Sequence, residues 1–110
     1  MGFTRVKQIL DDAITAWNND LNNAAPADLS GHGPSFAWDT KANLLAAVGH
    51  GKRLIQPEMI GNGQGKNTNL VVDLRTGISS PTLRMPKDGP FVPDSQVQEI
   101  VDWIDAGCPD

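Results

Sequence analysis

The sequence contains no tyrosine and a single cysteine, Cys108. One cysteine excludes a disulfide within the chain and is typical of proteins in a reducing compartment. Nine basic residues stand against thirteen acidic ones, a net charge of −4, whereas nucleic acids and anionic membranes bind clustered positive charge. No apolar run approaches the roughly 20 residues that span a bilayer, and the start, MGFTRVKQIL, lacks the apolar region of a secretory signal. We therefore expect a cytoplasmic protein that binds neither nucleic acid nor membrane.

The composition is that of a folded domain. The chain has 110 residues, of which 39% are hydrophobic, enough to build one core. No internal repeat or linker divides the chain. We expect a single domain over residues 1–110.

The N-terminal stretch shows the three- and four-residue spacing of an amphipathic helix. This helix is predicted to begin near Phe3 or Thr4 and to end in the turn-forming stretch NNDLNNAAPADLSGHGPS. Its predicted apolar face consists of Val6, Ile9, Leu10, Ala13, Ile14, Trp17 and Leu21.

A C-terminal helix is predicted within VPDSQVQEIVDWIDAGCPD. Asp94 or Ser95 is the expected N-cap, and Ser95 and Gln98 offer a capping box. Gly107 is expected to supply a left-handed C-cap, and Pro109 to stop the helix. The predicted buried stripe consists of Val97, Ile100, Val101 and Ile104.

Between these helices the pattern is weaker. Asp39 or Thr40 is expected to cap a shorter helix through KANLLAAV, closed by Gly49. From Gly49 to Pro93 we expect a mostly irregular chain with one strand-like run, NLVVDL. So long an irregular stretch in a small domain generally wraps a ligand, a cofactor or a partner.

The segment RMPKDGPFVPDSQVQEIVDWIDAG resembles the C-terminal part of bacterial c-type cytochromes, where a Met-Pro loop precedes a helix ending in Trp-Ile-x-x-Gly. The stretch FTRVKQILDDA is similar to the helix that precedes the haem-attachment motif of that family. The resemblance covers both ends of the chain and implies a mainly α, cytochrome c-like fold. We expect crossed N- and C-terminal helices, a shorter middle helix and long irregular loops, with the crossing near Leu10–Ile14 and Ile100–Ile104.

The family's Cys-x-x-Cys-His motif is missing from the position that the resemblance gives it. The aligned residues 13–17 read Ala-Ile-Thr-Ala-Trp, so that both cysteines are alanine and the histidine is tryptophan. In this family the cysteines form thioethers to the porphyrin and the histidine binds iron. We therefore expect no covalent haem and no cofactor, and a haem cavity filled by Ala13, Ala16 and Trp17. A tryptophan can bury about 200 Å².

Other aromatic residues are further candidates for filling that cavity. They are Phe36, Trp38 and Phe91. Trp103 takes the place of the family's usual helix aromatic, and we expect it at the contact between the terminal helices.

Three residues could bind a metal or a non-covalent haem. Met85 aligns with the family's distal iron ligand and is expected to remain as a packing methionine. His32 and His50 are each flanked by glycines, which keeps an imidazole accessible, and we expect them to be solvated loop residues. The alternative is a ligand role for Met85 toward non-covalent haem or copper. A copper site would combine these residues with Met59 and Cys108.

The stretch GNGQGKNT, residues 61–68, resembles a phosphate-binding loop only in part. Walker A requires Gly-x4-Gly-Lys-Ser/Thr, yet residue 60 is Ile and residue 67 is Asn. We expect a flexible, turn-rich surface loop with no helix after it. Catalytic groups are also sparse, because Cys108 lies at a helix C-terminus, where the dipole raises the pKa of a thiol. Asp11 and Asp12 are expected on a solvated helix face.

Three functional hypotheses follow. The first is a non-catalytic structural or interaction module that kept the scaffold after electron transfer was lost, with a protein partner or self-association. The second is a domain that holds haem, copper or a small molecule non-covalently in the former haem cavity. The third is an enzyme, or an enzyme subunit, whose chemistry occurs in that cavity. The position of Trp17 discriminates between a filled cavity and an open one.

Overall fold

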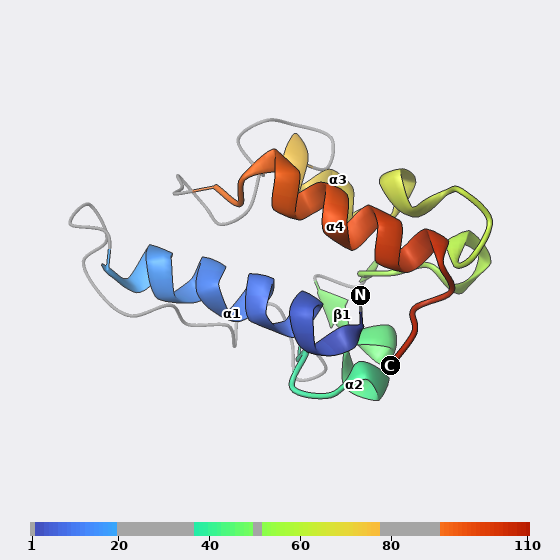
Figure 1. Cartoon of the computed structure of the whole chain (residues 1–110), viewed down its shortest axis with the longest axis horizontal. Helices are drawn as coiled ribbons and strands as arrows, with labels where there is room; N and C mark the ends of the chain where they lie inside the picture. Colours follow the sequence, from blue (N-terminus) through green and yellow to red (C-terminus); the bar gives the residue numbers. More distant parts are fainter. Residues whose placement is uncertain (1, 20–36, 50–51, 78–90) are drawn as a thin grey trace.

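The N-terminal helix predicted from the sequence is present as α1, Phe3–Asn19. The structure is a computed structural model, and it describes residues 2–19, 37–49, 52–77 and 91–110, with the backbone alone for residues 17–19. Val6, Ile9 and Leu10 are all buried, as the spacing of three and four residues requires for one face of a helix. α1 is the longest helix of the described ranges and extends past the other elements at one end (Figure 1).

α4, Asp94–Asp105, lies against α1 and runs in the opposite direction (Figure 1). The rings of Phe3 and Trp103 are 6.2 Å apart between centroids. The Arg5 guanidinium donates two hydrogen bonds to Glu99, at 3.0 and 2.9 Å. The contact thus involves the beginning of α1. Trp103 lies at this contact, as predicted, but the crossing predicted near Leu10–Ile14 is too far along α1.

The middle of the chain contains regular structure that we did not predict. α3, Asn69–Arg75, occupies the run NLVVDL that the pattern favoured as a strand. The Thr68 hydroxyl caps α3 by accepting a hydrogen bond from the Val71 N–H at 3.4 Å. Leu70, Val71 and Leu74 are buried, a helical spacing that the β-branched pair of valines concealed. Within residues 52–77 the prediction of an irregular chain was therefore wrong, because two 3₁₀ turns, Pro57–Met59 (η2) and Gly65–Asn67 (η3), precede α3. Residues 50–51 and 78–90 of the predicted irregular stretch lie outside the described residues.

α2, Lys41–Ala46, is the predicted short helix. Of the two expected caps it uses Thr40, whose hydroxyl accepts a hydrogen bond from the Asn43 N–H at 3.1 Å. α2 ends before Gly49, which belongs to a small antiparallel pair. This pair consists of β1, Val48–Gly49, and β2, Lys52–Arg53, in which Val48 faces Arg53.

The two ends of α4 differ in how well they were predicted. The N-cap is Pro93, with no side-chain cap, so the capping box of Ser95 and Gln98 was wrong. Gln98 instead joins α4 to α3, because its Oε1 accepts a hydrogen bond from Arg75 Nη2 at 2.9 Å. The C-terminal prediction is confirmed, since Gly107 has a φ of 94° and the Cys108 N–H donates to the Trp103 carbonyl at 3.0 Å. That bond closes the helix end in the way of a Schellman motif.

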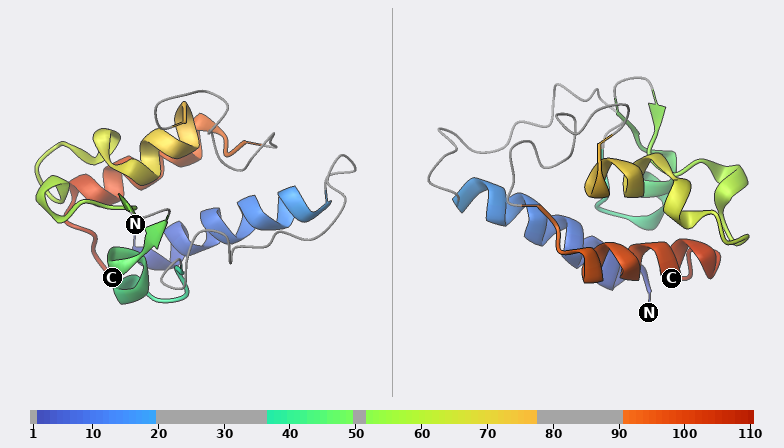
Figure 2. Two further views of the ribbon diagram at one scale, coloured as in Figure 1. Left: turned by 180° about the vertical axis from the view of Figure 1, so that it is seen from behind. Right: turned by 90° about the horizontal axis from the view of Figure 1, so that it is seen from above.

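The stretch GNGQGKNT lies at the surface, as predicted, with six of its eight residues exposed, but its backbone is docked on α4. The Gly61 N–H donates to the Ile104 carbonyl at 3.0 Å, and the Gly65 N–H donates to Asp105 Oδ1 at 2.8 Å. These backbone donors therefore bind α4 and not a phosphate. A helix, α3, does follow the stretch, contrary to our expectation, and Figure 2 shows α3 alongside α4.

The described residues form a mainly α structure with one apolar core between α1, α3 and α4. α2 and the segment Leu54–Ile55 contribute further buried side chains. Of the helices in the described ranges, none combines the length and the apolar character that crossing a membrane requires. The core residues are Val6, Ile9, Leu10, Leu44, Ala47, Leu54, Ile55, Leu70, Val71, Leu74, Val92, Val97, Ile100, Val101, Trp103, Ile104 and Cys108.

Candidate binding pocket

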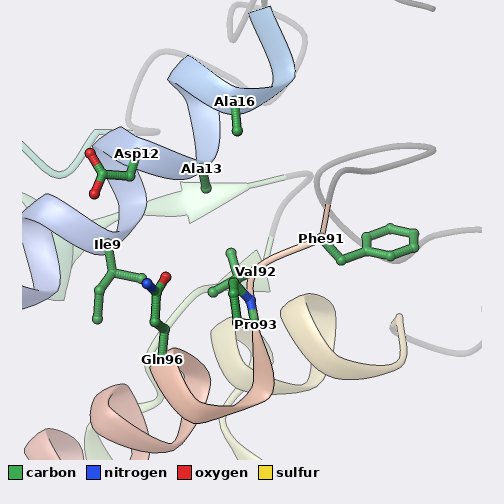
Figure 3. Close-up of a pocket in the computed structure, with 8 residues that line it drawn as sticks. All are labelled: Ile9, Asp12, Ala13, Ala16, Phe91, Val92, Pro93 and Gln96. Carbon is green, nitrogen blue, oxygen red and sulfur yellow. The ribbon is translucent and has the colours of Figure 1, made fainter. Parts of the chain in front are cut away.

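A pocket lies between the second half of α1 and the segment that leads into α4 (Figure 3). It begins where the closely packed part of the two helices ends, at Ile9. Four residues of α1 and four residues around the start of α4 line it: Ile9, Asp12, Ala13, Ala16, Phe91, Val92, Pro93 and Gln96.

The pocket exists because the side chains facing it from α1 are short. Positions 9, 12, 13 and 16 follow the three- and four-residue spacing of a single helix face. Two of them, Ala13 and Ala16, carry only a methyl group and point toward the opposite wall (Figure 3). On that wall Val92 is buried, and Pro93 sets the direction in which α4 begins. The methyl groups do not reach across, so a space remains.

The pocket has a volume of about 160 Å³ and is partly open to solvent. A buried apolar cavity of about 150 Å³ binds benzene, whereas sites for drug-sized ligands measure about 300–1,000 Å³. The described walls therefore enclose a space for one apolar side chain or one small ring. A porphyrin is several times larger than this space.

The lining is apolar apart from one carboxylate and one amide. Asp12 is exposed on α1, and Gln96 is half-buried on α4. Phe91 is 41% exposed, and its ring points away from Ala13 (Figure 3). An apolar floor next to an exposed aromatic ring and a single charge is suited to binding an apolar group with a polar neighbour.

The structure brings together three of the residues singled out in the sequence, Ala13, Ala16 and Phe91. The two alanines leave the pocket open, and the Phe91 ring points away from Ala13, so it does not fill the space as predicted (Figure 3). Trp17 belongs to α1, but its side chain lies outside the described residues. The same holds for the remaining predicted ligands and for one aromatic candidate: His32, His50, Met85 and Phe36.

Trp38 does not line the pocket. Its Nε1 donates to Asp11 Oδ1 at 2.9 Å, and Asp11 lies roughly 160° around α1 from Ala13 at 3.6 residues per turn. Trp38 thus covers the opposite side of α1, where it packs against the core. As a candidate for filling the cavity it was wrong, because its indole N–H is bound to the polar face of the helix.

The lone cysteine is part of the core. Cys108 is 2% exposed, and burial raises the pKa of its thiol, with a smaller opposing effect of Lys41. A protonated, buried thiol is a poor nucleophile. In the described ranges, no group of three or more His, Cys, Asp or Glu residues is arranged to hold a metal ion.

On the wall opposite α1, the sequence indicated Phe91 as an aromatic candidate for the cavity but missed the other lining residues. Val92 and Pro93 precede a helix and have no periodic pattern, so nothing in their spacing indicated a pocket. Ile9 and Asp12 could have been found, because they share the helical face of Ala13 and Ala16.

The carboxylate on the far side of α1 makes a pH-dependent contribution to stability. Asp11 accepts hydrogen bonds from Lys7 Nζ at 2.6 Å and from Trp38 Nε1 at 2.9 Å. These bonds, the lysine bond first, lower the pKa of Asp11. A lowered pKa stabilises the fold above the unfolded pKa of about 3.9, and this stabilisation is lost as the pH falls through the folded pKa.

We expect Asp11→Asn to be less stable than the unaltered protein at pH 7 and to approach it as the pH falls below about 4. Urea unfolding midpoints measured from pH 7 into the acid range give this comparison. Asp12→Asn is the control, because the Asp12 side chain makes no hydrogen bond with the rest of the described chain. A gap between Asp11→Asn and the unaltered protein that stays constant with pH would contradict the assignment.

No protein-family model, curated protein or solved structure matches this chain. A function can therefore be argued from the pocket, from the charges around it and from the resemblance seen in the sequence. The resemblance concerns the same two segments that form the pocket, the first helix and the entry to the last one.

Proposed function

We propose that this chain is a cytoplasmic, non-catalytic interaction module on a cytochrome c-like scaffold without covalent haem. Its pocket receives an apolar side chain of a protein partner. The observation that carries the proposal is the open, apolar pocket at Ala13 and Ala16, the positions where the resemblance places the lost attachment cysteines. The single cysteine of the chain supports the cytoplasmic location.

The core supports a module that folds on its own side chains. Val6 and Ile9 of α1 and Ile100 and Ile104 of α4 are each at most 1% exposed. A haem is a large part of the core in a small cytochrome, and a void of that size would cost about 24 cal/mol per Å³. In the described residues, the side chains of α1 and α4 fill the space where the two helices pack closely, which supports a core that folds without such a group.

The chemistry of the walls favours binding over catalysis. Acid–base catalysis requires a titratable group positioned against a reacting atom, and nucleophilic catalysis requires an activated nucleophile. The described lining offers Asp12, which is exposed, and the Gln96 amide. An aromatic or aliphatic side chain that enters an apolar pocket is the usual anchor of a protein interface.

A second candidate is non-covalent binding of a small molecule, and the same pocket favours it. Its volume fits a benzene-sized ring. For haem or copper, the ligands would come from His32, His50 or Met85, which lie outside the described residues.

A small aliphatic, diazirine-bearing photocrosslinking residue in place of Ala16, which is exposed at the edge of the pocket, tests the leading proposal. In the cells from which the protein comes, this variant is expected to form one discrete crosslinked product, whose partner is identified by mass spectrometry. The matched control carries the same residue in place of Glu58, an exposed position on η2 away from the pocket. An added Ala13→Trp substitution, which fills the pocket, is expected to abolish the product.

Absence of any product at position 16, or an identical product from position 58, would contradict the proposed module. The second candidate is tested on the purified protein by titration with haemin and then with copper, followed by absorption. A saturable, stoichiometric Soret band that is lost in His50→Ala or Met85→Ala would favour cofactor binding.

A further inference from the structure

We infer that the partner segment held by the pocket carries a lysine or arginine beside its apolar side chain, and that Asp12 binds this cation. The inference rests on the proposed function, because it specifies the chemistry of the partner at the same pocket. Asp12 would then distinguish, among partner segments with an apolar side chain, those that carry a cation next to it.

Asp12 is the one charged side chain among the residues that line the pocket (Figure 3). It stands between Ile9 and Ala16 along the same face of α1 and is exposed to solvent. Its carboxylate is directed away from Ala13 (Figure 3), so the groups beside the apolar side chain of a ligand, and not that side chain itself, would meet it. An anionic neighbour would be repelled there, and a cationic one attracted.

The nearby cations are already committed to other carboxylates. Arg5 is near enough to be influenced by the charge of Asp12, but its guanidinium donates to Glu99 and to Gln8. Lys7 pairs with Asp11 on the other side of α1, at 2.6 Å. Within the described part of the chain, Asp12 takes part in no ion pair, so its charge is available to a partner.

The remaining surroundings agree with a basic partner. The chain carries a net charge of −4, which attracts a cationic segment at long range. Asp94, next to the pocket residue Pro93, adds an exposed carboxylate on the other wall, although Arg75 pairs with it at 2.8 Å. Gln96 is neutral and can donate or accept a hydrogen bond, so it does not oppose a cation.

Two synthetic peptides test the inference on the intact protein. They share a central leucine and differ only in its flanking residues, which are lysines in one and glutamates in the other. Titration is followed by the backbone amide shifts of Ala13, Ala16 and Gln96. The lysine-flanked peptide is expected to shift these amides, and the glutamate-flanked peptide to shift them clearly less at the same concentration.

Asp12→Asn is expected to weaken the lysine-flanked peptide about two- to fivefold at low salt, the range of an exposed ion pair. The difference should fade at high salt, because screening weakens exposed charge pairs. Glu58→Gln is the matched control, since it removes the same charge at an exposed position away from the pocket, and it should leave binding unchanged. Ala13→Trp should abolish the pocket shifts of Ala16 and Gln96 by occupying the space.

Equal binding of the two peptides, equal effects of Asp12→Asn and Glu58→Gln, or no pocket shifts with the lysine-flanked peptide would each overturn the inference. Photocrosslinking from position 16 decides the proposed function separately. A crosslink from that position to a segment with an apolar side chain and no neighbouring cation would keep the module and overturn the basic partner. A crosslink between two copies of the chain would overturn it in favour of self-association.

Discussion

Replacement of Trp103 by alanine is expected to lower the free energy of unfolding by about 3–5 kcal/mol, the usual cost of removing a buried tryptophan. Trp103 is 1% exposed on α4. Its ring lies 6.2 Å from that of Phe3 on α1, and its Nε1 donates to the Pro109 carbonyl at 2.8 Å. The substitution thus removes the contact between the terminal helices and also releases the C-terminal residues that the indole holds.

Trp103→Phe separates these two contributions. Phenylalanine retains an aromatic ring against Phe3 but has no N–H for the Pro109 carbonyl, and we expect a loss between zero and that of Trp103→Ala. Urea unfolding of both variants, monitored by circular dichroism, provides the measurement. Domains of this size are stable by about 5–15 kcal/mol, so Trp103→Ala should lose a large share of the total stability and unfold at a clearly lower urea concentration. A loss below about 1 kcal/mol would show that Trp103 does not support the helix contact.

The elements that the sequence predicted are those whose apolar residues repeat with a helical period. α1 and α4 are amphipathic, and the side chains expected on their buried faces, such as Val6 and Ile100, are buried. Two helix ends were also predicted correctly. Thr40 caps the beginning of α2. Gly107 ends α4 with a positive φ, a conformation that few residues other than glycine adopt without cost.

The errors arose where tertiary contacts decide between local alternatives. Two adjacent valines favour a strand, yet Val71 lies in a helix because Thr68 caps it and α4 covers it. Ser95 and Gln98 have the spacing of a capping box, but Gln98 is held by Arg75 of another helix. Neither partner can be identified from neighbours in the sequence.

Of the eight residues that line the pocket, the sequence indicated three as cavity residues: Ala13, Ala16 and Phe91. Ala13 and Ala16 were found because the resemblance aligned them with attachment cysteines, and both line the pocket. The resemblance did not predict that the space between them and Val92 would stay open. Whether an alanine closes or lines a cavity depends on the opposite wall, and the path of that wall depends on how the chain enters α4 at Pro93.

The glycine-rich stretch before α3 gives the second large expected effect. Gly65 lies so close to α4 that a Cβ would be 2.8 Å from the Val101 carbonyl oxygen and 2.8 Å from Asp105 Oδ1. We expect Gly65→Val to destabilise the protein by about 3 kcal/mol, at the upper end of typical overpacking costs. Because Val101 O belongs to the backbone of a buried helix, η3 must move away instead. The hydrogen bond from the Gly65 N–H to Asp105 would then be lost.

Gly63→Ala is the matched control within the same stretch. Gly63 has a φ of 78° and no atom within 4 Å of an added Cβ, so alanine there causes only the strain of a left-handed backbone, about 1–2 kcal/mol. Denaturant unfolding should therefore place Gly63→Ala between Gly65→Val and the unaltered protein. The reverse order would show that the stretch is not docked on α4. The predicted order would show that the glycine at position 65 is required for close packing, because the residue there must be small where η3 meets α4. Phosphate binding would instead require the Gly65 N–H to be free.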